Sequence, residues 1–332
     1  MKRIIAVLCM AAALSCACTN TVRNNSNGIT VTARDGSKVR LEVVDSKIIR
    51  VTAVPKGARF HDGESLVVIP QEGRASFTTS SGDGCAMLST GDLTARVDIN
   101  DGKVTFSDAL TSETLAAEDR REFAPIEVEG SRGYTVRQVF QAADEAFYGL
   151  GQHQADEWNY KGRNEELYQY NTKISVPFVV SSKGYGVLWD SYSFCRWGDP
   201  RDYAHIGEVF TLYDKDGETG ALTGTYTPAS GEVLIRRESA LAQEFLRTPE
   251  CDIVRNSPEG FNFSGSHVSY EGCLEPSESG LFHFYLYYAG YTRVFIDGKE
   301  VMPEIWRTAW NPNGRKFECE MEAGRKYPVR IE

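Results

Sequence analysis

Alternation of apolar and polar residues over most of the first 140 positions constrains the fold more than any other feature of this sequence. Successive side chains of a β-strand point to opposite faces of a sheet, so a period of two predicts strands that are buried on one side. Around Asp35-Gly36, alternation over 29–33 resumes over 39–43, which predicts a hairpin with its turn at this dipeptide. The same pattern predicts strands at 49–53, 66–69, 75–79, 95–99, 104–106, 126–128 and 135–140, with a further turn at Asn100-Asp101-Gly102.

Short strands separated by frequent turn residues are typical of a β-sandwich. The many aromatic residues, with 16 Tyr, 16 Phe and 5 Trp, also favour strands. No stripe of period 3.6 precedes residue 235, and Glu238–Arg247 then predicts a short helix with Leu241, Phe245 and Leu246 on one side. The length of 332 residues accommodates about two domains. We therefore predict an all-β protein of two domains.

The first eighteen residues predict an export signal rather than part of the fold. Lys2 and Arg3 form a positive start, and the apolar stretch 4–14 is too short to span a bilayer. We therefore expect an exported protein.

A cysteine near the end of this signal is a candidate lipid anchor. Small residues precede both Cys16 and Cys18, so either is a candidate for the acylated residue of a bacterial lipoprotein, although neither has Leu three positions earlier. Ordinary secretion with removal of both cysteines is the alternative. Residues 19–28 then predict a polar tether. We expect lipid attachment to a membrane, with the protein at the outer membrane, cell surface or periplasm of a Gram-negative bacterium.

Charge and composition narrow the class of partner. The 36 basic and 46 acidic side chains give a formal charge of −10, and no run of Lys or Arg supplies the basic surface that nucleic acid requires. A neutral ligand is favoured instead. The five cysteines after residue 18 match no zinc spacing, and the five histidines are scattered, so we predict no metal and no cofactor. A Cys251–Cys273 disulfide and free thiols both remain open.

Residues 147–190 join a Gly-rich turn, a polar aromatic loop and two predicted strands without a break. In the turn YGLGQ, Gly149 and Gly151 can adopt positive φ without a Cβ penalty. The loop then combines flat rings with forked polar groups, a chemistry suited to sugars because rings stack and forked groups bind hydroxyls. Its members are Trp158, Tyr160, Arg163, Asn164, Glu165, Glu166, Tyr168 and Tyr170.

This arrangement resembles the N-terminal β-domain of glycoside hydrolase family 31, where a GLG(E/Q) turn precedes a loop that reaches the active site and a PF…S…GYG…W/L-D strand pair follows. Within the family it is most similar to bacterial α-xylosidases that act on xyloglucan fragments. The resemblance covers about residues 30–225. It implies a galactose-mutarotase-like β-sandwich over 29–219 and an oligosaccharide substrate.

The remaining third of the chain resembles the anthrax protective-antigen (PA)-type β-module that is inserted in many glycosidases. The residues that carry this resemblance are the strand HVSYEGCL at 267–274, the Ser-Gly turn and strand at 279–288, and RVFIDGKEV at 293–301. Lectins of this type that bind calcium use adjacent Asp residues, which 288–291 lacks, so we do not expect calcium-dependent sugar binding. Its aromatic residues form either a stacking surface or the core, and they are Tyr287, Tyr288, Tyr291, Trp306 and Trp310.

The end of the chain suggests truncation. Residues 327–331 alternate as a strand does, and the sequence then stops, so we expect a strand with an unpaired edge. The resemblance implies that such a module leads into a (β/α)₈ barrel, which carries both catalytic aspartates. We therefore expect 220–332 to be an incomplete PA-type module and the chain to hold no catalytic residue.

The resemblance implies that the loop at residues 158–170, called the rim segment below, forms the rim of a substrate pocket. Trp158 is the candidate for stacking, Arg163 and Asn164 for hydroxyl groups, and Glu165 for a more distant polar contact, with a structural role for each as the alternative. The acidic pairs Asp156-Glu157 and Glu165-Glu166 are expected to be solvated on a mobile loop. Gly149, Gly151 and Pro177 are assigned to backbone geometry, Phe178 and Trp189 to the sandwich core, and Arg196 and Trp197 to an interdomain contact.

Three functions follow as hypotheses. The first is the N-terminal fragment of a retaining family 31 α-glycosidase, an α-xylosidase acting on xyloglucan oligosaccharides, which completes its site with the missing barrel. The second is a non-catalytic surface lipoprotein that binds carbohydrate. The third is a remnant that cannot fold stably because its last strands have lost their partners.

Overall fold

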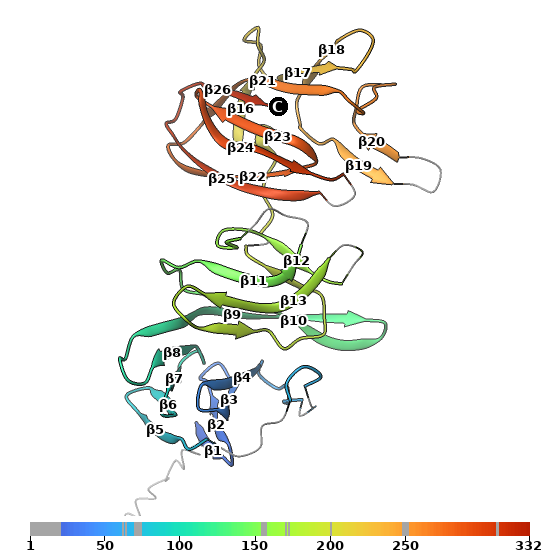
Figure 1. Ribbon diagram of the computed structural model, residues 1–332. Helices are drawn as coiled ribbons and strands as arrows, with labels where there is room; N and C mark the ends of the chain where they lie inside the picture. Colours follow the sequence, from blue (N-terminus) through green and yellow to red (C-terminus); the bar gives the residue numbers. More distant parts are fainter. Residues whose placement is uncertain are drawn as a thin grey trace, which may run out of the picture. The chain divides into compact units, whose positions relative to one another are not determined.

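The computed structural model describes residues 21–332 except 62, 64, 70–74, 154–157, 170, 172, 200, 248–251 and 310–311. These residues divide into two compact units, one that ends at Asp144 and one that runs from Glu145 to Glu332. Figure 1 labels strands of both units and colours them along the sequence. Both consist of antiparallel strands, and the one helix in the described ranges is a single turn. The prediction of an all-β fold is confirmed.

The first unit contains two antiparallel sheets whose strands lie in chain order. The four-stranded sheet consists of β1 (Val22–Asn25), β2 (Gly28–Thr32), β3 (Lys38–Asp45) and β4 (Ile48–Val54). The six-stranded sheet consists of β5 (Thr78–Gly82), β6 (Cys85–Ser89), β7 (Leu93–Asp98), β8 (Val104–Asp108), β9 (Thr114–Val128) and β10 (Ser131–Phe140).

Alternation builds the core of this unit. In the predicted hairpin, Ile29 of β2 pairs with Leu41 of β3, and both are fully buried. The turn forms where expected, with Asp35 Oδ1 accepting a hydrogen bond from the Ser37 amide at 2.8 Å. The six-stranded sheet contributes the other half of the core with Ala86, Leu88, Ala95, Val97 and Val104.

Three predicted segments differ from the structure of this unit. Residues 66–68 form bends and Ile69 has no regular structure, so the expected strand is not formed, and Leu66 and Ile69 are 81% and 79% exposed. The strand expected over 75–79 begins at Thr78. Val22–Asn25, which the prediction places in the tether, forms β1 on β2, and the Asn25 side chain donates to Thr30 Oγ1 at 2.9 Å.

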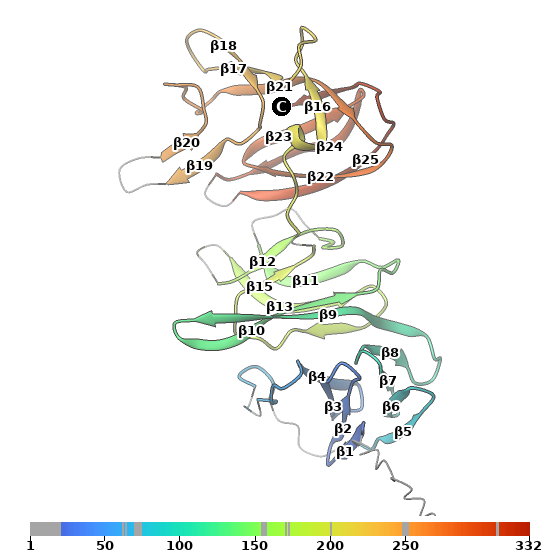
Figure 2. The same cartoon turned by 180° about the vertical axis from the view of Figure 1, so that it is seen from behind.

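The second unit begins with two small sheets. One consists of β11 (Phe147–Gln152), β13 (Ile174–Ser181) and β14 (Gly186–Leu188), and the other pairs β12 (Glu165–Leu167) with β15 (Cys195–Trp197). The single-turn helix α1 (Ile206–Val209) leads to the rest of the unit, seen from behind in Figure 2.

A seven-stranded sheet forms most of this remainder, in the order β18-β17-β21-β26-β23-β24, with β16 also paired to β21. Its strands are β16 (Phe210–Tyr213), β17 (Leu222–Thr227), β18 (Leu234–Glu238), β21 (His267–Pro276), β23 (Gly290–Ile296), β24 (Lys299–Arg307) and β26 (Tyr327–Ile331). Two further pairs are β19 (Glu244–Arg247) with β20 (Asp252–Arg255), and β22 (Gly280–Tyr288) with β25 (Asn313–Met321).

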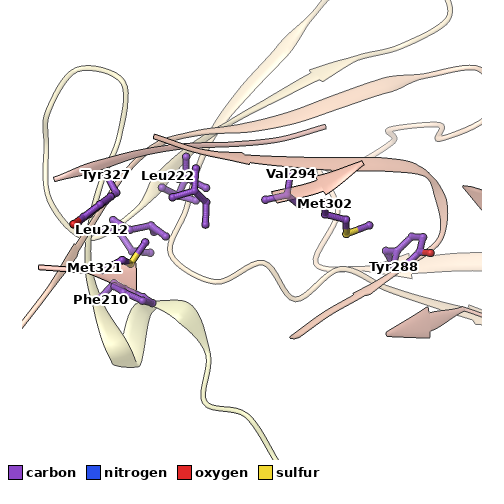
Figure 3. Packing of buried hydrophobic residues seen from close by; sticks show 11 residues of the cluster. Phe210, Leu212, Leu222, Tyr288, Val294, Met302, Met321 and Tyr327 are labelled. Atoms are coloured by element: carbon purple, nitrogen blue, oxygen red, sulfur yellow. The ribbon is translucent and has the colours of Figure 1, made fainter. Parts of the chain in front are cut away.

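An apolar cluster lies on the inner side of these strands, where Figure 3 shows side chains from β16, β17 and β22–β26 meeting. Leu222, Leu274, Met302 and Met321 are at most 1% exposed. The predicted domain boundary at 219/220 falls inside this unit, since β16 pairs with β21, and that boundary remains a prediction.

Two predictions about this unit are wrong. Instead of the expected helix over 238–247, Glu238 ends β18 and residues 244–247 form β19, because pairing with β17 and β20 overrides the local helical pattern. The strand at 327–331 has no unpaired edge: β26 lies between β21 and β23, with Val329 opposite both Gly272 and Ile296.

Candidate functional site

Two glycines in β11 set the backbone from which the predicted rim segment departs. Gly149 and Gly151 have φ values of +118° and +100°. A Cβ would lie 2.6 Å from the Phe178 carbonyl oxygen at the first and 2.0 Å from the Ile174 carbonyl oxygen at the second. Only glycine fits this close approach, which confirms the assignment of both residues to backbone geometry. Between them Leu150 points into the interior and is 2% exposed.

The side chains predicted to face the substrate separate into exposed and anchored groups. Trp158 is 86% exposed, and Arg163 is half-buried. Burial lowers the pKa of Arg163, and the electrostatic effect of Tyr288 partly offsets that decrease. Asn164 is engaged with the protein, because its amide donates to the Asp199 carbonyl at 2.9 Å and accepts from the Asp199 amide at 3.0 Å. These two hydrogen bonds, called the Asn164 clamp below, join the segment around Asn164 to the segment around Asp199. Asn164 therefore has the structural role that the sequence suggests as the alternative to binding sugar hydroxyls.

Glu165 lies in the interior on β12. Its side chain is 4% exposed, and Oε1 lies 3.1 Å from Lys173 Nζ and 3.3 Å from His153 Nδ1. His153, fully buried, donates from Nε2 to the Leu150 carbonyl at 2.8 Å. The expectation that Glu165 is solvated on a mobile loop is therefore wrong.

Glu166 behaves as expected, because the next side chain along a strand points to the opposite face. It is 53% exposed and lies 3.7 Å from Arg196. Residues 154–157, including the other acidic pair, lie outside the described residues.

A small apolar cluster packs residues of the rim segment against β11 and β13. It is formed by Leu150, Tyr160, Leu167 and Val179. Trp197 joins it by an edge contact with Phe147 at 5.2 Å between ring centroids and by donating from Nε1 to the Tyr160 carbonyl at 3.0 Å. Burial and the Glu165 carboxylate raise the pKa of Tyr160. The segment is therefore held by packing as well as by charge.

The assignment of Phe178 and Trp189 to the sandwich core is wrong within this unit, where they are 40% and 37% exposed. Val179, the neighbour of Phe178 on β13, is 4% exposed. The strand therefore buries the opposite face from the predicted one. Alternation defines both faces, and the sequence does not say which one is covered.

A buried carboxylate just before β11 was not predicted. Glu145 is 9% exposed and accepts hydrogen bonds from Tyr185 Oη at 2.8 Å and from Ser181 Oγ. Burial, followed by the bond to Glu145, raises the pKa of Tyr185. A Glu in a linker carries no local signal of this kind, because its partners come 36 and 40 residues later.

The predictions about metal ligands and cysteines can be compared with the structure only for the described residues. Within the described ranges, no group of three or more His, Cys, Asp or Glu side chains is arranged to hold a metal ion. Cys85 is a buried free thiol, and Cys195, Cys273 and Cys319 are half-buried free thiols. No helix in these ranges has the length and apolar character for a membrane span. Cys16, Cys18, Tyr170, Cys251 and Trp310 lie outside the described residues.

Comparison with known proteins shows which family the region around this site is similar to. Residues 38–197 match the family described as the glycosyl hydrolase 31 N-terminal galactose mutarotase-like domain. This region of the chain is therefore similar to the family 31 N-terminal domain. The domain spans the boundary between the two units and includes the Gly149–Gly151 turn, Glu165 and the Asn164 clamp.

Relatives of the family 31 domain include α-xylosidases. An α-xylosidase of Saccharolobus solfataricus is 32% identical over 166 residues, which cover 47% of this chain and 22% of the relative. An uncharacterized family 31 glucosidase of Pseudescherichia vulneris is 47% identical over 74 residues, which cover 22% of this chain and 13% of the relative.

The crystal structure of a family 31 α-xylosidase from Xanthomonas citri superposes with a TM-score of 0.74 at 38% identity. The match covers 93% of this chain and 34% of that protein, so it extends beyond residue 197. This chain spans about a third of that structure and less than a quarter of the two curated relatives.

Proposed function

We propose that this chain is the N-terminal part of a retaining family 31 α-glycosidase, an α-xylosidase that acts on xyloglucan oligosaccharides. In this proposal the chain supplies the scaffold and the rim of the substrate pocket. A (β/α)₈ barrel of the same enzyme supplies both catalytic aspartates. Residues 220–332 act as a PA-type module, and Cys16 or Cys18 carries the lipid that attaches the exported enzyme to the membrane.

The observation that carries the proposal is the rim segment within the matched family 31 domain. Its Trp158 is 86% exposed. Among the described residues nearby, Gly151 lies in close approach to β13, and Asn164 is hydrogen-bonded to Asp199. An exposed indole ring is suited to stacking on a sugar, because its flat face is not covered by the protein.

The acidic residue of the rim is poorly suited to bond cleavage. A retaining glycosidase needs two carboxyl groups about 5–5.5 Å apart, one as nucleophile and one as acid and base. Glu165 is instead occupied by Lys173 at 3.1 Å and His153 at 3.3 Å. We therefore assign Glu165 to supporting the rim segment, and the reaction to the barrel.

The test compares this chain with the product of the whole gene, including everything encoded beyond codon 332. With 4-nitrophenyl α-xyloside we expect no turnover by the chain alone. The longer product should release α-xylose first, detected by proton NMR before mutarotation. A stop codon directly after codon 332 contradicts the proposal, as does any turnover by the purified chain alone.

The proposed anchor has its own test. Metabolic labelling with a radioactive fatty acid should mark the wild-type protein in membranes. Label that persists when both Cys16 and Cys18 are replaced by Ala, or that is absent from the wild type, contradicts this part of the proposal.

A further inference from the structure

Two large aromatic side chains lie exposed next to each other on the seven-stranded sheet. Tyr291 of β23 is directly opposite Trp306 of β24, and they are 71% and 54% exposed. Directly opposite residues of an antiparallel pair have Cβ atoms about 4.5–5.5 Å apart, so the two rings form one surface. Neither ring is used by the proposed pocket rim at Trp158.

Strand geometry holds both rings outward. Thr292 and Arg307, the next residues on each strand, are 9% and 3% exposed. Further along the same strands, Val294 and Met302 lie in the apolar cluster shown in Figure 3. Since neighbouring side chains on a strand point to opposite faces, Tyr291 and Trp306 cannot turn inward without breaking the pairing.

The surroundings of the pair suit a small neutral ligand. Arg293, two positions after Tyr291, is ion-paired with Glu332, so its charge is already balanced. Glu304, two positions before Trp306, is exposed. Charged groups therefore border an apolar area of only two rings. A stable protein interface buries about 800 Å² on each partner, so this area suits a small ligand better than a protein. Rings with a hydroxyl and an indole N–H beside forked polar groups fit a sugar, whose C–H face stacks and whose hydroxyls bond.

We propose that Tyr291 and Trp306 form a stacking subsite for a neutral oligosaccharide. This inference rests on the proposed function, because the ligand belongs to the class that the rim is proposed to bind. The subsite is separate from the residues proposed for the rim and needs no metal ion.

The experiment measures binding of the 332-residue chain to xyloglucan oligosaccharides by isothermal titration calorimetry, with dextran and mixed-linkage β-glucan oligosaccharides in parallel. The variants are Trp306→Ala and Tyr291→Ala. Trp306→Gln serves as a second, more conservative change. Tyr134→Ala is the matched control, because Tyr134 is an exposed aromatic residue, 46% exposed, on β10 of a different sheet. Trp158→Ala tests the rim.

We expect Trp306→Ala and Tyr291→Ala each to raise Kd about tenfold, the loss that corresponds to one stacked ring, while Tyr134→Ala leaves Kd unchanged. Undiminished binding in both variants, or no binding by the wild type to any of the glycans, overturns the inference. Binding that depends on Trp158 alone overturns the subsite and supports the rim. Binding that depends on Trp306 but selects a glycan without xylose supports the subsite and contradicts the proposed α-xylosidase specificity.

Discussion

Adjacent glutamates on β12 have opposite environments, although they are chemically identical. Glu165 is 4% exposed between Lys173 and His153, while Glu166 is 53% exposed beside Arg196. A buried ion pair is costly to break because the remaining charge stays in the interior without its partner, whereas an exposed pair contributes little. The two positions therefore form a matched test of whether Glu165 supports the rim segment.

Glu165→Gln should lower the free energy of unfolding by about 3–5 kcal/mol, because it leaves the Lys173 ammonium uncompensated. Glu166→Gln, the control, should change it by no more than about 1 kcal/mol. Urea unfolding followed by fluorescence measures both. Equal effects of the two variants would show that Glu165 is not part of a buried charge cluster.

Gly151→Ala tests the close approach in β11. The added Cβ would lie 2.0 Å from the Ile174 carbonyl oxygen at a φ of +100°, so β11 and β13 must separate locally. The control Gly162→Ala also introduces positive-φ strain, at +72°, but its Cβ meets nothing within 4 Å. We expect the control to cost about 1–2 kcal/mol and Gly151→Ala to cost clearly more, measured as loss of thermal stability. Equal losses would remove the steric argument.

At the scale of elements, pairing decided outcomes that local patterns did not predict. The segment 244–247 has helical periodicity, and it forms β19 because β20 offers a hydrogen-bonded partner. In the same way, β26 was expected at an edge and lies between β21 and β23. Turns are easier to predict from the local sequence than strand pairing, because the side chain that closes a turn lies within the turn itself.

The turn that follows β8 shows such local closure and predicts a pH dependence. Asp108 Oδ1 accepts from the amides of Thr111 at 2.7 Å and Leu110 at 2.9 Å, and these bonds lower the pKa of Asp108. A carboxyl whose pKa is lower in the folded state stabilises above its unfolded pKa, about 3.9, and the contribution disappears as pH falls through the folded pKa.

Asp108→Asn should therefore be less stable than the wild type at pH 7, and the difference should shrink as the pH falls below about 4. Urea unfolding midpoints between pH 2.5 and 7 measure this difference. Parallel stability curves for the two proteins would mean that the charge of Asp108 does not contribute.

For the molecule as a whole, each unit has an apolar core of its own. Leu88 is fully buried in the first core and Leu274 is 1% exposed in the second. Replacing either residue by Ala should cost about 2–5 kcal/mol in the unit that contains it. We expect calorimetry to show two transitions, with Leu88→Ala lowering one and Leu274→Ala lowering the other. A single transition that both variants lower equally would contradict this prediction.

The sequence by itself determined the all-β class, the hairpin at Asp35-Gly36 and the glycine turn of β11. Each depends on residues close together in the chain: a period of two, a turn dipeptide, or a position that only glycine can occupy. The resemblance to family 31, carried by residues 147–190, also came from contiguous residues, and the comparison with known proteins confirmed its domain.

The tertiary structure alone decided which face of each strand is covered and which partner each strand finds. It exposed Phe178, buried Glu165, and placed β26 inside a sheet. The physical reason is that alternation tells which side chains share a face, whereas burial depends on segments that are far away in sequence. For the same reason the pairing of Tyr291 with Trp306 became visible only when β23 and β24 were aligned.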